Sequence, residues 1–313
     1  VVLYFFDLPV WTVFVMLCVR GIGSTFQQPA IQSMIPQLVP KDQLVKTNGW
    51  MQLLNSGSFL LGPVIGASLY AIFPMSIVLM SDVAGAIFAS IALAVVKIPK
   101  PEKTNQKQQH FIAEIKEGLQ VFREDKKLFY VVIAEALCMF FYAPLSSFYP
   151  LMTSDYFKLS AMYGSAVELS FAIGMMISSL LFSSVLKINR KIRVSFIGLF
   201  GMGVMSLLCG IIPPAYIGWF FFAGSCICLG AFGNVHTIPL TAYMQETISP
   251  DRMGRAFSVL TLISSVTMPV GLLFSSPIAE KTGVNVWFFL SGLCMLILTA
   301  GVSIGYAAEC RKK

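Results

Sequence analysis

Charged side chains are scarce in this sequence. Only 12% of its 313 residues are Asp, Glu, Lys or Arg, whereas soluble globular proteins carry about 25%. Hydrophobic residues make up 56% of the chain, the mean hydropathy is +0.77, and apolar runs recur along the whole length. A removable secretory leader explains one such run but not many. The composition therefore indicates an integral membrane protein.

The sequence also lacks the motifs of catalysis and of metal binding. It has two histidines, His110 and His236, and no His or Cys cluster with the spacing of metal ligands. The motif Cys226-x-Cys228 has no second pair, so we interpret the cysteines as small core residues. No Gly-rich phosphate loop is present, which argues against transport driven by ATP. We expect no enzyme activity, no metal and no cofactor.

Basic residues give the chain a net charge of +7, but they form no continuous face, so we expect no nucleic-acid partner. They lie in short clusters between apolar segments of about 20 residues or more, the length that crosses a bilayer as a helix. We expect an all-α integral membrane fold with nine spanning helices, preceded by an apolar stub too short to span. The predicted segments are 8–34, 47–73, 75–96, 128–151, 161–186, 192–212, 214–243, 254–278 and 285–308.

The connections between these segments alternate in charge. Of the 22 Lys and Arg residues, 19 fall in one set of alternate connections and only two, Lys158 and Lys281, in the other. The remaining one, Arg20, lies within a predicted helix. Because cytoplasmic loops carry an excess of Lys and Arg, we place the first set and the C-terminus in the cytoplasm. The sequence thus predicts a multi-pass protein of the cell (cytoplasmic) membrane.

The longest connection, residues 97–127, belongs to the cytoplasmic set. Its apolar residues from Phe111 to Phe122 recur at helical spacing, as in an amphipathic helix on the inner membrane surface. A solvated linker helix without lipid contact is the alternative. The linker separates the remainder of an N-terminal helix bundle, residues 1–96, from a C-terminal bundle of six helices, residues 128–313.

Two segments of the chain resemble each other. In QPAIQSMIPQLVPKDQL and TIPLTAYMQETISPDRM, Pro29 and Pro40 match Pro239 and Pro250 at a common offset of 210 positions. Related halves joined by a loop are typical of transporters built from repeats. The second half has three further helices, within 128–212, for which the first half offers only the stub. We therefore expect that roughly 85 residues of first-half sequence are missing from this chain.

One helix carries an unusual run of small residues and proline, Ser58-x-x-x-Gly62-Pro63-x-x-Gly66-Ala67. Ser58, Gly62 and Gly66 share a helix face on which another backbone can approach closely, and Pro63 bends the helix. The run resembles the antiporter signature in helix five of the major facilitator superfamily, with a small residue at both positions that differ. The resemblance implies export by antiport. Plain packing of a Pro-kinked helix is the alternative.

Other stretches strengthen the resemblance. Arg20-Gly21-Ile22-Gly23 partly matches the superfamily's helix-four Arg motif. QQPAIQSMIPQLVPKDQLVKTNG and SDVAGAIFASIALAVVKIPK are similar to its macrolide-efflux and siderophore-exporter branch. The superfamily has twelve helices in two bundles of six with a long cytoplasmic middle loop. The resemblance therefore implies that the nine predicted helices are numbers four to twelve of an N-terminally truncated transporter.

Charges inside apolar spans are costly, so each is a functional candidate. The predicted proton-coupling residues are Arg20, Asp82, Glu135 and Glu168. A carboxyl group in a low-dielectric cavity can carry a proton at neutral pH. The resemblance associates the Arg with proton coupling through a neighbouring carboxylate. Structural ion pairs or hydrogen bonds between helices are the alternatives for all four.

Aromatic residues are dense around one of the predicted helices. Phe140, Phe141 and Tyr142, together with His236, are candidates to line a substrate cavity. An apolar, aromatic cavity with a few acids suits bulky amphipathic cations. Lipid-facing packing is the alternative for the aromatic rings, and a structural role is the alternative for His236.

We predict a secondary active transporter that exports amphipathic small molecules, such as macrolide-like drugs, by proton antiport with alternating access. Its partners are a small-molecule substrate, protons and the lipid bilayer, and we expect a monomer. The alternatives are proton-coupled or facilitated uptake of a small metabolite, or a truncated membrane protein that does not transport.

Overall fold

The computed structural model describes residues 10–95, 111–184 and 188–311. These residues form helices joined by short turns and include no strand, so the expected all-α fold is confirmed. The elements are α2 (Val10–Leu38), the 3₁₀ turn η1 (Lys41–Gln43), α3 (Leu44–Ile72), α4 (Met75–Val95), α5 (Phe111–Glu124), α6 (Lys126–Tyr142), α7 (Leu145–Leu151), the π-helical turn η2 (Met152–Tyr156), α8 (Ala161–Ser184), α9 (Lys191–Ile211), α10 (Tyr216–Thr247), α11 (Pro250–Thr282) and α12 (Val284–Arg311).

Eight segments of the described chain are long and apolar enough to cross a membrane. They are α3 with η1, α4, α6 continued through α7 and η2, and α8 to α12. They coincide with eight of the nine predicted spans. The remaining predicted span, 8–34, is helical over its described part as α2, but it is not one of the eight. The count of nine and the numbering four to twelve stay predictions.

Local sequence determines where helices begin and end. The Asp125 carboxylate accepts hydrogen bonds from the backbone N–H groups of Lys127 (2.9 Å) and Leu128 (3.4 Å) at the start of α6, where helical donors have no partner of their own. Gly283 follows α11 with a φ of +103°, a conformation that residues with a Cβ rarely adopt. These two residues separate α5 from α6 and α11 from α12.

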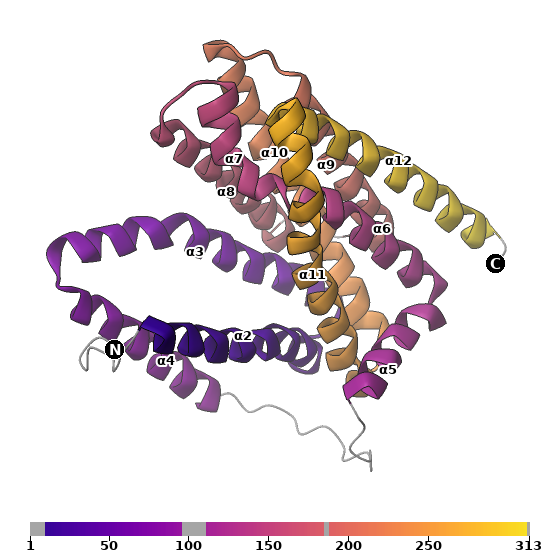
Figure 1. Ribbon diagram of the computed structural model, residues 1–313. Helices are drawn as coiled ribbons and strands as arrows, with labels where there is room; N and C mark the ends of the chain where they lie inside the picture. The colour runs from indigo at the N-terminus through magenta and orange to yellow at the C-terminus, as the bar shows by residue number, and fades with distance from the viewer. Residues whose placement is uncertain (1–9, 96–110, 185–187, 312–313) are drawn as a thin grey trace.

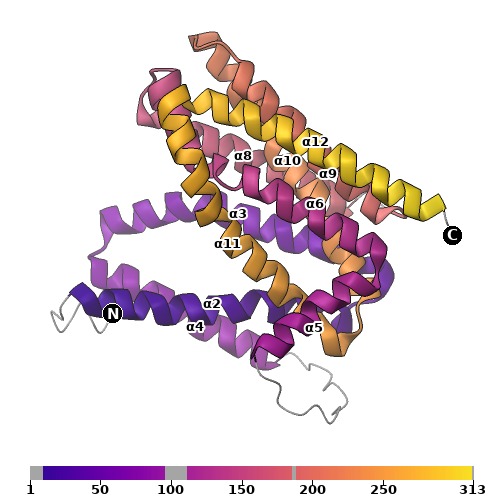
Figure 2. The same cartoon turned by 45° about the vertical axis from the view of Figure 1, so that its right-hand side comes forward.

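Helices α6 to α12 pack around one apolar core, and α2 to α4 are attached to one end of it. Helix α2 packs against α11, and α3 packs against α8 and α10. Figures 1 and 2 both show α3 leaving the bundle toward its C-terminal end, with α2 and α4 beside each other. No side chain of α4 is buried within the described chain. Fully buried core residues include Leu128, Leu199, Phe222, Met244 and Phe288.

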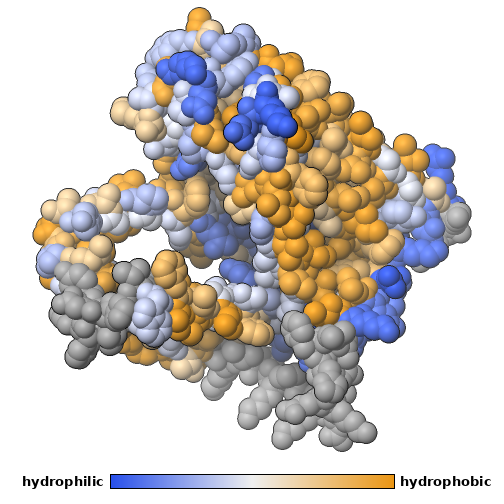
Figure 3. Space-filling model, viewed as in Figure 1, coloured by the Kyte–Doolittle hydropathy of each residue, from blue (hydrophilic) through white to orange (hydrophobic). Residues whose placement is uncertain are grey.

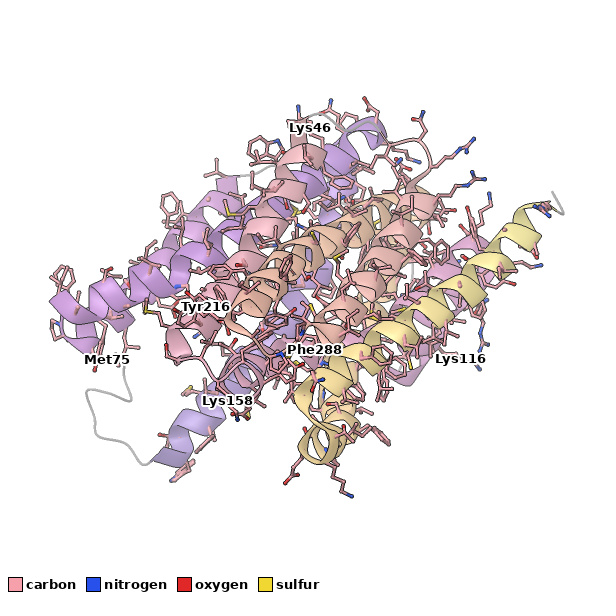
Figure 4. The ribbon with its side chains drawn as sticks, turned by 90° about the horizontal axis from the view of Figure 1, so that it is seen from above. Lys46, Met75, Lys116, Lys158, Tyr216 and Phe288 are labelled. Atoms are coloured by element: carbon pink, nitrogen blue, oxygen red, sulfur yellow. The ribbon has the colours of Figure 1, made fainter. Side chains whose placement is uncertain are left out.

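The connections with different predicted sides lie at different ends of the helices. Figure 4 shows Lys46 and Lys116 toward one end and Met75, Lys158 and Tyr216 toward the other. Figure 3 shows an apolar band over α11 and α12 between polar ends. This arrangement matches helices that present an apolar middle to lipid and keep charges at the interfaces.

Ion pairs hold the basic connections together at their end. They join residues that are far apart in the sequence, as expected if alternate connections share one face of the membrane. The pairs are Lys126–Glu309 (2.8 Å), Lys191–Glu246 (2.8 Å) and Arg252–Glu124 (2.7 Å).

Helix α5 is the amphipathic helix predicted in the linker, and it docks on the protein. Val121 and Phe122 are buried against the core. A Cβ at Gly118 would lie 2.8 Å from the backbone oxygen of Arg255, so the backbone of α5 touches α11. The apolar face of α5 therefore lies against protein. The sequence analysis placed this face on the inner membrane surface, with a solvated linker helix as the alternative. The side chains of residues 111–113 lie outside the described residues.

The repeat seen in the sequence reappears as matching helices. Helix α3 ends at Ile72 and α11 ends at Thr282, which are 210 positions apart. Helices α2 and α10, and α4 and α12, correspond at nearly the same offset. The contacts follow the same correspondence. Helix α2 packs on α11, and the matching helices of the other half, α10 and α3, also pack on each other. The two halves are therefore related in their packing as well as in their sequence.

Glycines let the helices of the bundle approach closely. A Cβ at Gly198 of α9 would collide with the backbone nitrogen of His236 on α10 and would lie 2.7 Å from its Cα. That distance is shorter than real Cβ contacts, and the obstacle is a backbone atom that cannot rotate away. By contrast, a Cβ at Gly224 of α10 would meet no atom within 4 Å. Gly198 is thus required by the α9–α10 contact, whereas Gly224 is not.

We expect Gly198→Ala to destabilise the protein by about 1–3 kcal/mol, because the added methyl group forces α9 and α10 apart. Gly224→Ala is the control, and it should be neutral or stabilising because alanine favours helix over glycine. The midpoint of thermal unfolding in detergent measures both changes. Equal effects of the two substitutions would contradict the close-approach argument.

The link between α5 and α11 predicts a dependence on pH. The hydrogen bond from Arg252 lowers the pKa of Glu124. A carboxyl group whose pKa is lower in the folded state stabilises the fold above its unfolded pKa, and this stabilisation is lost as the pH falls through the folded pKa. Acidification below about 4.3, the ordinary pKa of glutamate, should therefore speed hydrogen exchange of the α5 amides.

In Glu124→Gln the ion pair is already lost at neutral pH, so acid should accelerate exchange in α5 less than in the wild type. Glu114→Gln changes an exposed residue of the same helix and serves as the control. An identical acid response of the wild type and Glu124→Gln would refute the role of this pair.

Candidate functional site

Helices α6 and α10 bring two predicted residues together. Glu135 of α6 and His236 of α10 lie with Oε1 and Nε2 4.0 Å apart. The His236 side chain is fully buried, and 19% of the Glu135 side chain is exposed. The sequence assigned Glu135 to proton coupling and His236 to the substrate cavity, but it gave no sign that the two are neighbours.

Ser195 of α9 completes the cluster. Its Oγ lies 2.7 Å and its backbone oxygen 3.2 Å from Nδ1 of His236. On the opposite side of the cluster, Oε2 of Glu135 and Nε2 of His236 are buried without a hydrogen-bond partner. Buried polar atoms of this kind are rare, because leaving them unpaired costs free energy. A carboxyl and an imidazole that lie beside each other, each with a buried atom that has no partner, are suited to holding and exchanging a proton.

Two other predicted residues also come together. Arg20 of α2 and Asp82 of α4 approach with Nη1 and Oδ2 3.9 Å apart, and about three quarters of each side chain is exposed in the described chain. The pairing agrees with the expectation that the Arg has a neighbouring carboxylate. Glu168 of α8 is exposed and has no ion-pair or hydrogen-bond partner among the described residues.

The aromatic candidates lie where α6 meets α11 and α12. The Phe140 ring is 5.8 Å from the Phe274 ring of α11, and the Phe141 ring stacks on Trp287 of α12 at 6.3 Å. Tyr142 is half-buried against the same core. Their role in a substrate cavity stays a prediction.

The run that resembles the antiporter signature lies in the part of α3 that leaves the bundle. Pro63 is inside the helix, and a Cβ at Gly62 or Gly66 would meet no atom of the described chain within 4 Å. Ser58 and Ala67 are exposed as well. No other described backbone lies against Gly62 or Gly66, and the role of this run in antiport stays a prediction.

A buried chain of amides, which the sequence did not suggest, joins α2, α3 and α10. Asn48 of α3 donates to Oε1 of Gln245 of α10 at 2.7 Å. Gln245 in turn donates to the backbone oxygen of Gln32 of α2 at 3.0 Å and to its side-chain oxygen at 3.1 Å. Asn48 and Gln245 are almost fully buried. In the sequence, the one indication of these contacts is an amide residue among apolar residues near the end of a predicted helix.

Charged and apolar contacts surround this chain of amides. Lys41 donates to the backbone oxygen of Glu246 at 3.2 Å, and Lys191 pairs with the Glu246 carboxylate. A Cβ at Gly49 would lie 2.8 Å from the backbone nitrogen of Ser183, so α3 and α8 touch closely. Together these contacts close the end of the molecule that carries the basic connections. The apolar members are Ile35, Leu44, Val45, Phe182, Ile238 and Ala242.

The fold and its repeat can now be compared with known proteins. A family model described as Major Facilitator Superfamily matches residues 1–272 of the chain. The chain belongs to this superfamily. Members of the superfamily are transporters, so the expectation of a multi-pass membrane transporter is confirmed.

Relatives within the superfamily include two macrolide exporters. The chain is 36% identical over 299 residues to macrolide efflux protein A of Streptococcus pyogenes, covering 95% of this chain and 73% of that protein. It is 35% identical over 273 residues to macrolide efflux protein A of Enterococcus faecalis, covering 87% and 84%. The staphyloferrin A transporter of Staphylococcus aureus is 22% identical, with 94% and 72% covered. The predicted branch is thus confirmed.

Solved structures of the superfamily share the fold. The human organic anion transporter MFSD10 superposes with a TM-score of 0.70 at 14% identity, covering 87% of this chain and 66% of that chain. The Escherichia coli fucose:proton symporter FucP superposes with a TM-score of 0.64 at 14% identity, covering 88% and 72%. At this identity the likeness demonstrates the major facilitator fold alone.

The chain of amides in this superfamily member yields a prediction. Gln245→Ala removes the partner of Asn48 and of Gln32, and unpaired buried amides cost about 1–3 kcal/mol. We expect α3 and α10 to separate at this end. Spin labels at the exposed positions Lys46 and Arg193, in a cysteine-free background, should show longer and broader distances.

Gln37→Ala is the matched control, because within the described part of the chain the Gln37 amide bonds only to the backbone oxygen of Ser33 in its own helix, at 3.1 Å. It should leave the label distances unchanged. Unchanged distances in Gln245→Ala as well would mean that the amides do not hold this end closed.

Proposed function

We propose that the chain exports amphipathic small molecules, macrolides among them, across the cytoplasmic membrane in exchange for protons. The observation that carries the coupling is the placement of Glu135 beside His236 inside the C-terminal bundle, with unpaired buried atoms on both. The substrate class follows from the macrolide efflux proteins, to which the chain is 36% identical over 299 residues and 35% identical over 273 residues.

The proposed coupling uses Glu135 as the group that titrates. In the hydrocarbon region an ionised carboxylate is costly, so loading or releasing its proton changes the free energy of the surrounding helices. Glu135 is partly exposed, which gives protons a way in, and His236 offers a second site for the proton. Arg20 and Asp82 would supply a charge pair on the other side of the transporter.

Alternating access fits the distribution of contacts. The basic connections face the cytoplasm in the proposed orientation, as does the C-terminus, and the chain of amides and ion pairs closes that end. Away from it, α3 diverges from the bundle and exposes the Gly62–Gly66 face. We assign this arrangement to an outward-facing state of a monomer with nine spanning helices, numbers four to twelve. Residues 1–96 and 128–313 form its two bundles, joined by residues 97–127.

The other proposed sites follow from this state. The Gly62–Gly66 face would receive another helix backbone as the two bundles move, which is the role that the antiporter resemblance implies. Phe140, Phe141 and Tyr142 would offer aromatic surface to an amphipathic cation at the mouth of the bundle. Coupling is assigned to Glu135 and not to Glu168, because Glu168 is exposed and has no ion-pair or hydrogen-bond partner among the described residues.

Inverted or reconstituted vesicles that contain the protein provide the test. With erythromycin as the probe and an imposed pH gradient, we expect the wild type to drive uphill macrolide movement that an ionophore abolishes. Glu135→Gln should lose gradient-driven movement at least tenfold, because its amide cannot exchange a proton. Arg20→Ala should also reduce coupling.

Glu168→Gln makes the same chemical change at an exposed position, and it should keep gradient-driven movement within about twofold. Macrolide movement that does not respond to ionophores would overturn proton antiport. Full coupling in Glu135→Gln would overturn the role of Glu135.

A further inference from the structure

The Nδ1 atom of His236 faces two oxygens of one residue that differ in chemistry. The backbone oxygen of Ser195, at 3.2 Å, can only accept a hydrogen bond. The Ser195 hydroxyl, at 2.7 Å, can also donate one. Nδ1 can therefore be satisfied whether or not it carries a proton. The opposite ring atom, Nε2, points toward the Glu135 carboxyl and has no other partner.

We propose that Ser195 is a positioning residue that lets the imidazole of His236 change tautomer as Glu135 gains and loses its proton. The inference rests on the proposed role of Glu135 in proton coupling. It assigns Ser195, which the sequence did not single out, to the coupling mechanism.

The protons balance in both states. When Glu135 is protonated, its O–H donates to Nε2, and Nδ1–H donates to the backbone oxygen of Ser195. When Glu135 is ionised, Nε2–H donates to the carboxylate, and Nδ1 accepts from the Ser195 hydroxyl. The imidazole is neutral in both states, so one net proton is gained or lost by Glu135. A side-chain rotation must first shorten the 4.0 Å gap between Nε2 and Oε1, which exceeds a hydrogen bond.

A neutral imidazole is required by its surroundings. His236 is fully buried, and a buried charge is costly unless it is paired and hydrogen-bonded. A Ser195 that offered only an acceptor would fix one tautomer, in which Nε2 repels an ionised Glu135. The hydroxyl removes this restriction, because it stabilises the other tautomer equally well.

Among the described residues, Glu135 and His236 form no ion pair with any other charged side chain. The helices that carry or flank the pair also hold Cys138 of α6 and Thr299 of α12, whose Sγ and Oγ1 atoms are 3.5 Å apart. Near the ends of the neighbouring helices, Lys191 of α9 pairs with Glu246, Arg252 of α11 with Glu124, and Glu309 of α12 with Lys126. Glu168 of α8 is exposed. The exposed Arg193 belongs to the same end of α9.

The test follows the proton on Glu135 directly by infrared spectroscopy. The carbonyl band of the protonated carboxyl, identified by its loss in Glu135→Gln, is titrated with pH in the full chain without substrate. In Ser195→Ala only the backbone oxygen remains as a partner for Nδ1. This favours the tautomer with the proton on Nδ1, in which Nε2 accepts a hydrogen bond from protonated Glu135. We expect Glu135 to bind its proton about tenfold more tightly in this variant, the effect of one lost hydrogen bond.

Two variants separate positioning from packing. Ser195→Thr keeps the hydroxyl and should restore the wild-type titration. Ser206→Ala removes another buried hydroxyl of α9, which bonds to Phe288 and Ser291, and should not change it. A wild-type titration in Ser195→Ala, an equal shift in Ser206→Ala, or the absence of a Glu135 carbonyl band would overturn the inference.

The infrared titration requires no transport, so the two proposals fail separately. If Ser195→Ala titrates like the wild type while macrolide movement still depends on Glu135, the tautomer change alone is overturned. Coupled transport in Glu135→Gln overturns the proposed role of Glu135 in coupling, whatever the infrared result.

Discussion

The close contact between α9 and α10 is the constraint on which the candidate site depends. Lipid tails are as apolar as the helix surfaces, so helices in a bilayer are held by packing and hydrogen bonds more than by the expulsion of water. Gly198 allows the two backbones to touch beside His236. That contact brings Ser195 within hydrogen-bond distance of the imidazole and turns its other nitrogen toward Glu135. Because glycine has no side chain, Gly198 lets α9 and α10 come close enough for the hydrogen bonds of this polar cluster to form.

Much of the fold could be predicted from the sequence because the bilayer restricts the possible structures. Backbone groups in hydrocarbon must be satisfied within the segment, which allows helices of defined length. The correspondence of α2 with α10 followed from the repeat of Pro29 and Pro40 at Pro239 and Pro250, and the shared end of the basic connections followed from charge alternation. The docking of α5 did not follow, because an amphipathic face shows that a helix lies on an apolar surface without showing whether that surface is lipid or protein. Gly118 was the residue that permitted protein contact.

The candidate site was predicted in its parts but not in its arrangement. Glu135 and His236 were singled out because polar groups are costly in apolar helices, yet they lie about a hundred positions apart on different helices. Their proximity depends on the rotation and depth of each helix, which periodicity does not define. Ser195, Asn48 and Gln245 were missed for a related reason. Serine and amide side chains occur often in membrane helices, and only a partner on another helix distinguishes them.

The composition of the closed end bears on how a transporter of this kind can move. Most buried side chains in the core of α6 to α12 are apolar, and apolar side chains gain nothing from water when they separate. The contact of α2 and α3 with α10 contains, beside its apolar members, the buried amides Asn48 and Gln245, and Lys41 next to it donates to the backbone oxygen of Glu246. Water can satisfy these polar groups when the contact opens. Exchanging such hydrogen bonds for bonds to water changes the free energy by only about 1 kcal/mol each. The proposed cycle therefore separates the chain at the interface that costs least to hydrate, and it leaves the α6–α9–α10 cluster intact to carry the proton.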